Sequence, residues 1–274
     1  MNSSSSFSCS SSSAKGVICS TTRTRTRTIF IQVGLAAFLL VRCGASAQIT
    51  NTLSDAEISG RQLARKLCDV YVENSTNTGV LKVRDAQGRR SEILVECEVI
   101  TTATNWQNRY QAKFGTNAND VTTLIVTHCN AESNSYVLFE RLSIHIGMGL
   151  SGNRTMTPFA GSDFWICDLG LEFFHWPDQK ILKREFRRNC SCAVLESTNP
   201  HPGANSYSRV VSWIDEESGG IVMARAYDAQ GRLLKEFYPK DVKKVNGEWQ
   251  VQSMEIDNVQ TGSRTRLELD LKSP

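Results

Sequence analysis

Residue types that carry most enzyme chemistry are scarce in this 274-residue sequence. There are four histidines, and none has an evident catalytic partner. The Gly-x-Ser-x-Gly elbow, the His-Glu-x-x-His zinc motif and a glycine-rich phosphate loop are all missing. We therefore expect a protein that is not an enzyme. A hydrolase that acts through carboxylates far apart in the chain stays open as an alternative, because such acids can converge in a fold.

Long hydrophobic runs are scarce as well. The prominent one, Ile29 to Val41, has about 13 residues, fewer than the roughly 20 that a membrane-spanning helix needs. It follows an arginine-rich stretch at residues 23–27 and is closely followed by Ala45-Ser46-Ala47. This order of basic, apolar and small residues predicts a Sec-type secretory signal in residues 1–47, cleaved after Ala47. A permanent membrane anchor is not expected.

Two other interpretations of this leader are weaker. A start rich in arginine and serine and free of acids is also typical of an organellar transit peptide, but such a peptide needs neither the compact apolar core nor the Ala-x-Ala ending. Cys43 resembles a lipid-modified cysteine, but Arg42 stands where small residues normally precede that site. Export therefore remains the expectation.

The positive net charge of the sequence comes from the leader. Residues 1–47 contain five basic and no acidic residues, so their removal changes the formal charge from +3 to −2. A nucleic-acid partner is not expected, because the basic balance that suggests one would be discarded with the leader. The remaining residues, 48–274, are enough for a single domain.

Cysteine is the exception among the scarce reactive residues. Six of the nine cysteines follow the leader: Cys68, Cys97, Cys129, Cys167, Cys190 and Cys192. An even number in an exported chain permits disulfides without assigning their pairing. The close pair Cys190-Ser-Cys192 lacks two further ligands at suitable spacing, so we expect neither a metal site nor a cofactor.

The mature chain is expected to begin with one amphipathic helix. Ser54 and Glu57 form a capping-box pattern, and Leu63, Leu67, Val70 and Tyr71 recur on one helical face. We expect this helix to cover a sheet and to end in a break at Asn74 to Gly79. A second, short helix is expected over Asp163 to Phe174, capped by Ser162, with Phe164, Cys167, Leu171 and Phe174 on one side.

Strand patterns dominate the rest of the sequence. Alternating or β-branched segments bounded by turn residues predict strands at Leu81–Arg84, Glu92–Ile100, Trp106–Phe114, Val121–Thr127, Tyr136–Ile146, Ile181–Phe186, Ala193–Leu195, Tyr207–Ile214, Ile221–Tyr227, Leu233–Phe237, Trp249–Ile256 and Arg264–Leu271. The sequence Asp-Ala-Gln-Gly-Arg occurs at Asp85 and again at Asp228. We interpret both copies as tight hairpin turns and not as an internal repeat.

The segment from Phe159 to Leu271 resembles the outer-membrane lipoprotein-sorting (LolA-like) family. The residues that carry the resemblance are Gly161-Ser162-Asp163-Phe164, Asp168-Leu169, Tyr207-Ser208-Arg209-Val210, Trp213-Ile214-Asp215, Tyr227-Asp228, Gly231-Arg232-Leu233-Leu234-Lys235, Trp249, Met254-Glu255-Ile256, Thr261-Gly262 and Arg264-Thr265. From Ile49 to Ile146 mainly the order of helix and hairpin agrees.

The resemblance implies a mainly β (α+β) fold: an incomplete antiparallel β-barrel, or half-barrel, with covering helices and an apolar cavity between them. It also implies a non-catalytic carrier in the bacterial periplasm that binds the acyl chains of lipoproteins or other lipids and works with inner- and outer-membrane partner proteins. The two predicted helices would be its moving parts. A periplasmic protein-binding module of the same fold is the alternative, because an edge strand or the concave face could hold a polypeptide.

Six large apolar residues on the predicted helix and strands are candidates to line the cavity: Phe164, Phe174, Trp213, Met223, Phe237 and Trp249. For each of them, ordinary core packing is the competing interpretation. We expect His175 to be packed or at the surface and not to be catalytic. Arg187 and Arg188 could meet a lipid headgroup, although paired arginines usually form a solvated face.

Overall fold

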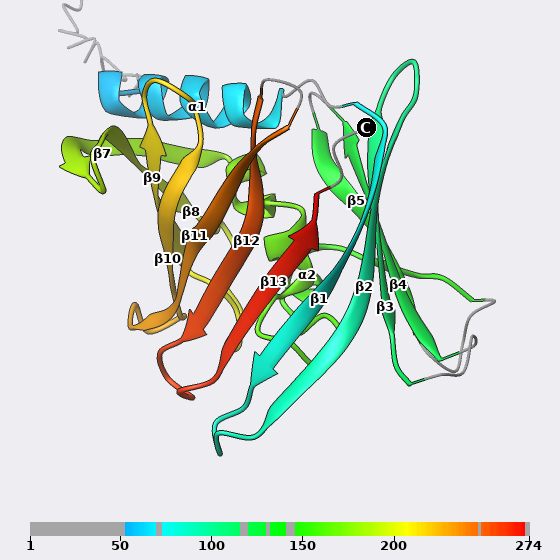
Figure 1. Ribbon diagram of the computed structural model, residues 1–274. Helices are drawn as coiled ribbons and strands as arrows, with labels where there is room; N and C mark the ends of the chain where they lie inside the picture. The colour runs from blue at the N-terminus through cyan, green and yellow to red at the C-terminus, as the bar shows by residue number, and fades with distance from the viewer. Residues whose placement is uncertain are drawn as a thin grey trace, which may run out of the picture. The chain divides into compact units, whose positions relative to one another are not determined.

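A single antiparallel sheet of 13 strands makes up most of the described part of the chain (Figure 1). The structure is a computed structural model and describes residues 53–69, 73–115, 120–129, 132–140, 146–245 and 248–271. The predicted leader, residues 1–47, lies outside the described residues. The strand order is β6-β5-β4-β3-β2-β1-β13-β12-β11-β10-β9-β8-β7, and every neighbouring pair is antiparallel. The sheet therefore stays open, with β6 and β7 at its edges.

The strands agree in number and order with the sequence patterns, apart from the additional short β6. Their bounds are β1 Ser75–Arg84, β2 Arg90–Thr101, β3 Trp106–Lys113, β4 Val121–Cys129, β5 Glu132–Phe139, β6 Met148–Leu150, β7 Asp178–Arg187, β8 Cys190–Thr198, β9 Arg209–Asp215, β10 Ile221–Tyr227, β11 Leu233–Val245, β12 Glu248–Asn258 and β13 Arg264–Asp270. The prediction of an unclosed, mainly antiparallel β fold with few helices is confirmed.

The two Asp-Ala-Gln-Gly-Arg sequences form the same turn at two hairpins, β1–β2 and β10–β11. In each, one carboxylate oxygen of the aspartate accepts the backbone N–H of the arginine four residues later, at 2.9 Å for Asp85 and 2.8 Å for Asp228. Gly88 and Gly231 have positive φ angles of 81° and 74°, which glycine adopts without a steric penalty. The local chemistry of these turns explains their recurrence.

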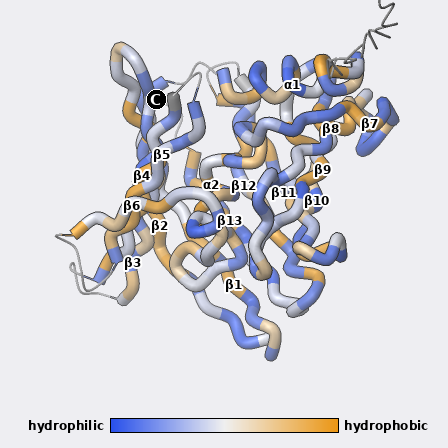
Figure 2. The backbone as a smooth tube through the Cα atoms, turned by 180° about the vertical axis from the view of Figure 1, so that it is seen from behind, coloured by the Kyte–Doolittle hydropathy of each residue, from blue (hydrophilic) through white to orange (hydrophobic). Residues whose placement is uncertain are grey.

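Helix α1, Asp55–Cys68, has the predicted capping box. The Glu57 N–H donates to Ser54 Oγ at 3.3 Å, and the Ser54 N–H donates to the Glu57 carboxylate at 2.7 Å. Along the helix, hydrophilic and hydrophobic turns alternate (Figure 2). The helix packs on β7, and Gly60 makes this possible, because a Cβ there would lie 2.6 Å from the Lys180 backbone nitrogen. Val70 and Tyr71 lie outside the described residues.

Helix α1 ends at Cys68, before the predicted break at Asn74 to Gly79, but the predicted start of the first strand at Leu81 is wrong, because β1 already begins at Ser75. This segment is polar and contains a glycine, but β2 and β13 flank it and pair with its backbone. Tertiary pairing thus overrides local propensity. The strand expected over Tyr136 to Ile146 ends at Phe139, and Leu142 and Ile144 lie outside the described residues.

The continuous helix expected over Asp163 to Phe174 is also wrong. The segment forms a short helix α2, Ile166–Leu169, and a 3-10 turn η2, Glu172–His175. Between them the chain runs so close to β5 that a Cβ on Gly170 would lie 2.3 Å from the Tyr136 hydroxyl oxygen, and Leu171 takes a left-handed φ of 49°. Packing against the sheet therefore interrupts the helical pattern.

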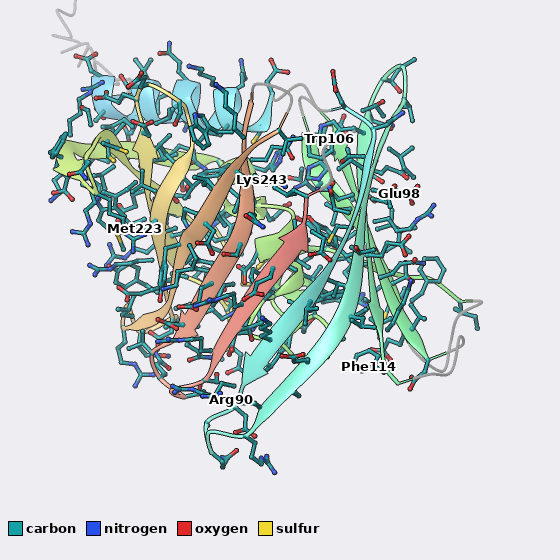
Figure 3. All side chains as sticks on the ribbon, in the orientation of Figure 1. Arg90, Glu98, Trp106, Phe114, Met223 and Lys243 are labelled. Carbon is teal, nitrogen blue, oxygen red and sulfur yellow. The ribbon has the colours of Figure 1, made fainter. Side chains whose placement is uncertain are left out.

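The strands of the sheet have one end near α1 and the other end away from it. Trp106 on β3 and Lys243 on β11 lie toward the end near α1, whereas Arg90 and Phe114 lie toward the opposite end (Figure 3). The main hydrophobic core joins one face of the sheet to α1, α2 and η2 through buried residues such as Ala64, Ile166 and Phe174. This arrangement places the irregular α2–η2 segment over the sheet.

Candidate functional site

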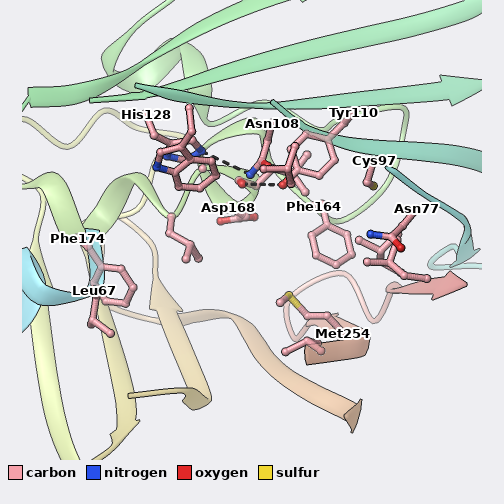
Figure 4. A pocket seen from close by; sticks show the side chains of 18 of the residues that line it. Leu67, Asn77, Cys97, Asn108, Tyr110, His128, Phe164, Asp168, Phe174 and Met254 are labelled. Atoms are coloured by element: carbon pink, nitrogen blue, oxygen red, sulfur yellow. Dashed lines mark hydrogen bonds between the residues drawn. The ribbon is translucent and has the colours of Figure 1, made fainter. Parts of the chain in front are cut away.

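A cavity of about 410 Å³ lies between the sheet and the α2–η2 segment (Figure 4). Its apolar walls come from four parts of the chain that are distant in sequence. They are Leu67 on α1; Val99, Trp106 and Tyr110 on β2 and β3; Phe164, Leu169 and Phe174 on the covering segment; and Met254, Leu267 and Leu269 on β12 and β13. A concave, largely apolar site of this size is typical of small-molecule and lipid sites.

A second cavity of about 220 Å³ adjoins the first. The two share Phe164, Asp168, Leu171, Val251 and Met254 in their walls. From there the second cavity runs along β10 and β11. Its further wall includes Ile221, Ala224 and Phe237. The two cavities thus lie side by side, the first against the β1–β4 half of the sheet and the second against the β10–β12 half.

The two histidines of the cavity wall carry no charge near neutral pH. The rings of Trp106 and His128 are stacked with centroids 3.7 Å apart, and the Asn108 amide nitrogen lies 3.5 Å from His128 Nε2. Burial lowers the pKa of His128 to about 4 and also lowers the pKa of His175. Both imidazoles are therefore neutral at pH 7, and they contribute surface to the cavity but no charge.

A buried polar cluster anchors the covering segment beneath the cavity. Asp168 accepts the Trp165 N–H at 2.8 Å and the Tyr207 hydroxyl at 3.0 Å. The Lys235 ammonium lies 3.4 Å from the same carboxylate and 3.7 Å from the centroid of the Trp165 ring. Burial raises the pKa of Asp168 and lowers that of Lys235, while their mutual attraction opposes both shifts. Each member of the pair thus compensates the charge of the other, and burial of either charge alone would cost free energy.

Asp163 supplies a second anchor on the same segment. Its carboxylate accepts the Thr265 hydroxyl at 2.8 Å and the Ser263 hydroxyl at 2.5 Å. Its backbone carbonyl accepts the Lys235 ammonium at 2.7 Å. The covering segment is therefore tied to β11 and to the start of β13. Asp163, Lys235 and Thr265 belong to the motifs that carry the family resemblance, so these motif residues anchor the covering segment and do not line the cavity.

Three of the six candidate cavity residues lie in the cavity walls. Phe164 lines both cavities, Phe174 lines the first and Phe237 lines the second. All three are buried in the main core.

Trp213 and Met223 are placed elsewhere, and their assignment to the cavity needs correction. They pack in a second cluster with Cys192, Val194 and Val211. On β9 the neighbours Val210 and Ile214 belong to the main core instead. Successive side chains of a strand point to opposite faces, so Trp213 faces away from the cavity.

Trp249 also lies outside both cavity walls, and its side chain is 70% exposed.

Sequence reasoning missed the wall residues on strands β1 to β4. Trp106, Tyr110 and His128 lie in the polar segment from Thr101 to Ser135, which did not suggest an apolar wall. A signal was available for β13, since Leu267 and Leu269 alternate with acids, and for α1, where Leu67 lies on the apolar face.

Metal-binding groups, carboxylates and cysteines were the other candidates for chemistry. Within them, no group of three His, Cys, Asp or Glu side chains could hold a metal ion. Asp215 and Glu216 lie at the β9–β10 turn, where they bind Ser218 and Arg184. The cysteines among the described side chains are all free. No helix in the described ranges is long and apolar enough to cross a membrane.

A protein-family model described as an uncharacterized protein matches residues 117–271, more than half of the chain. The chain belongs to this family, and it has the LolA-like fold. No curated protein matches the sequence. Solved structures of the same fold therefore provide the comparison.

Three of these structures show the likeness. A putative outer membrane lipoprotein-sorting protein domain from Vibrio parahaemolyticus is 23% identical, with a TM-score of 0.64 over 78% of this chain and 92% of that one. A DUF1329 family protein from Desulfovibrio piger is 19% identical, with a TM-score of 0.63 over 79% and 92%. A LolA superfamily protein from Nitrosomonas europaea is 13% identical, with a TM-score of 0.52 over 80% and 93%. The resemblance noted in the sequence is confirmed.

Proposed function

We propose that this protein is an exported, non-catalytic carrier that holds an acyl chain of a lipoprotein or another lipid in the two adjoining cavities and moves it between membranes. The observation that carries the proposal is the pair of adjoining, largely apolar cavities under the α2–η2 cover, in whose walls the Asp168 carboxylate is compensated by Lys235 and the imidazoles are neutral. The fold shared with a lipoprotein-sorting domain supports it. Membrane proteins that load and unload the carrier are the expected partners.

The energetics favour such a guest. Each methylene that leaves water contributes roughly 0.8 kcal/mol, so a long acyl chain offers on the order of 10 kcal/mol before ordering costs are subtracted. The wall contains few groups that a hydrocarbon would leave unpaired. Tyr110, for example, donates its hydroxyl to the Leu169 carbonyl at 3.2 Å and needs no partner from a ligand.

A protein-binding module is the second candidate, and the edge strand β7 favours it. Phe186 on this strand is 73% exposed, and Leu182 is also exposed. An extended peptide could pair with such an edge. A stable protein partner on lipid-free material would support this second function.

A cavity-filling variant tests acyl binding directly. Val99 on β2 lines the first cavity, whereas Leu94 on the same strand is 59% exposed. We expect Val99→Trp to reduce the uptake of a fluorescent fatty acid at least tenfold, because the indole would occupy the space of the chain. Leu94→Trp is the matched control and should leave uptake unchanged.

Lipid extraction after gentle purification provides the second measurement. Mass spectrometry should find acyl species with the wild-type protein and with Leu94→Trp, and far less with Val99→Trp. The absence of both bound acyl species and fatty-acid uptake in the wild-type protein would overturn the carrier proposal. The export signal is tested separately, since mass spectrometry of the mature protein should place its first residue at Gln48.

A further inference from the structure

An exposed apolar rim stands beside the cavity. It consists of Val242, Trp249 and Val251, which are 55%, 70% and 40% exposed. Val242 and Val251 are paired across β11 and β12, and Trp249 is paired with Lys244. Val251 also lines both cavities. The rim is therefore continuous with the cavity wall, and it gathers three exposed apolar side chains at one place, which is the kind of patch that marks an interaction site.

Basic residues flank this rim on two sides. Lys244 is paired with Trp249 and shares its face of the hairpin. Lys243 lies on the opposite face, where its ammonium donates to the Leu271 carbonyl at 2.9 Å. Leu67 lines the same cavity as Val251, and it belongs to the last turn of α1, where Arg65 and Lys66 lie. Asp69 follows as an acid at the end of that helix. The cavity is thus bordered by apolar side chains with lysine and arginine around them.

We propose that the apolar rim docks on the surface of an anionic lipid bilayer, with Trp249 at the level of the headgroups and Lys244, its partner across the hairpin, against their phosphates. Trp is favoured at the membrane interface because its ring is apolar and its N–H is polar. Docking in this way brings Val251, and with it the cavity, to the membrane. Membrane docking rests on the proposed carrier function, because that function gives it a purpose. Vesicle binding, which tests it, can be measured whether or not the protein holds an acyl chain.

The size and chemistry of the rim favour a bilayer over a protein partner. A stable protein interface buries about 800 Å² on each side, whereas the rim offers three exposed apolar side chains at the end of a hairpin. A bilayer needs only shallow insertion of an aromatic ring together with basic residues, each of which contributes about 1 kcal/mol near an anionic surface. Figure 3 shows Lys243 toward the same end of the sheet as Trp106, which lines the cavity.

Vesicle co-sedimentation of the full mature chain tests the proposal. The probes are vesicles of phosphatidylcholine with about one third phosphatidylglycerol, and vesicles of phosphatidylcholine alone. We expect Trp249→Ser to weaken binding to the anionic vesicles about tenfold, the factor that corresponds to about 1.4 kcal/mol. Phe186→Ser is the matched control, because Phe186 on β7 is an equally exposed aromatic residue away from the rim. It should bind like the wild type.

Charge is tested by Lys244→Gln, because Lys244 shares the face of Trp249. It should weaken binding to the anionic vesicles about fivefold, as expected for about 1 kcal/mol per basic residue, and it should not alter binding to phosphatidylcholine alone. A Trp249→Ser protein that binds like the wild type would overturn the proposal. Equal losses for Trp249→Ser and Phe186→Ser would overturn it as well, since they would indicate nonspecific hydrophobic adsorption.

The two proposals fail in distinguishable ways. In vesicle-free solution, Trp249→Ser should take up the fluorescent fatty acid normally, because Trp249 lies outside both cavity walls. Vesicle binding without fatty-acid uptake would overturn the carrier function alone. Uptake without Trp249-dependent vesicle binding would overturn the docking surface alone. Thermal unfolding of each variant confirms that the fold is retained.

Discussion

The buried pair of Lys235 and Asp168 leads to a quantitative prediction about the free energy of unfolding, because the pair fixes the covering segment to the sheet. Lys235 is fully buried and contacts Asp168, the Asp163 carbonyl and the Trp165 ring. In Lys235→Met, the side-chain length is roughly kept, but the Asp168 carboxylate loses its buried cation. Removal of one partner of such a pair typically lowers the free energy of unfolding by about 3–5 kcal/mol. In a domain of this size that corresponds to roughly 10 °C in Tm.

Urea and thermal unfolding measure this loss, and Lys82→Met provides the control. Lys82 pairs with Glu268 at 2.6 Å, but both side chains are partly exposed to solvent. Exposed ion pairs contribute about 0–1 kcal/mol, so Lys82→Met should barely change the unfolding midpoint. If Lys235→Met also costs less than about 1 kcal/mol, the pair does not anchor the cover as the geometry indicates.

The pH dependence of the Lys235→Met variant gives a second check. Burial already raises the pKa of Asp168, and Lys235 is the largest opposing influence. Without the lysine, the folded-state pKa rises further above the unfolded value, so the folded variant binds a proton more tightly than the unfolded chain. Its stability deficit should therefore shrink at acid pH, as Asp168 becomes protonated. Asp168→Asn in the same chain should recover part of the loss at pH 7. A deficit that is constant between pH 4 and pH 8 would contradict this account.

Two further predictions concern α1 and the turn η2. Gly60→Ala should lower the free energy of unfolding by about 1–3 kcal/mol, because the new Cβ would lie 2.6 Å from the Lys180 backbone nitrogen; chemical denaturation measures it, with the solvent-facing Arg61→Ala as control. Burial raises the pKa of Glu172 to about 7. The folded protein therefore binds this proton more tightly than the unfolded chain does. The stabilisation that results is fully present below the unfolded pKa of Glu172 and is lost as the pH rises through about 7. Glu172→Gln should flatten the stability profile between pH 5 and pH 8, and an unchanged profile would refute the assignment.

The fold could be predicted well where local chemistry decides the structure. The capping box at Ser54 and the two turns at Asp85 and Asp228 form the bonds that their residue types predict. Alternation of apolar residues located most strands. The errors lie where tertiary contacts decide, at Ser75, which pairs within the sheet, and at Gly170, where close packing on Tyr136 interrupts a helical pattern.

The cavity was harder to predict than the fold, because size and hydrophobicity do not reveal which face of a strand a residue occupies. Trp213 is as large and apolar as Phe237, yet it belongs to the cluster on the other face. Register is the missing information, since a shift of one residue reverses the face of every side chain. Trp249 shows the same problem near a hairpin end, because the register of β11 and β12 shifts between Pro239 and Val242, before the strands reach it.

The anchors of the covering segment bear on how a ligand could enter. Both predicted helices were expected to move, but the structure makes their movements unequal in cost. Lifting α2 would separate Asp168 from Tyr207 and Lys235 and would expose a buried ion pair during the change. At the end of α1, by contrast, Leu67 closes the same cavity through apolar contact. Moving Leu67 would break apolar contacts and no ion pair, so under the proposed carrier function we expect the end of α1 to be the less costly entrance.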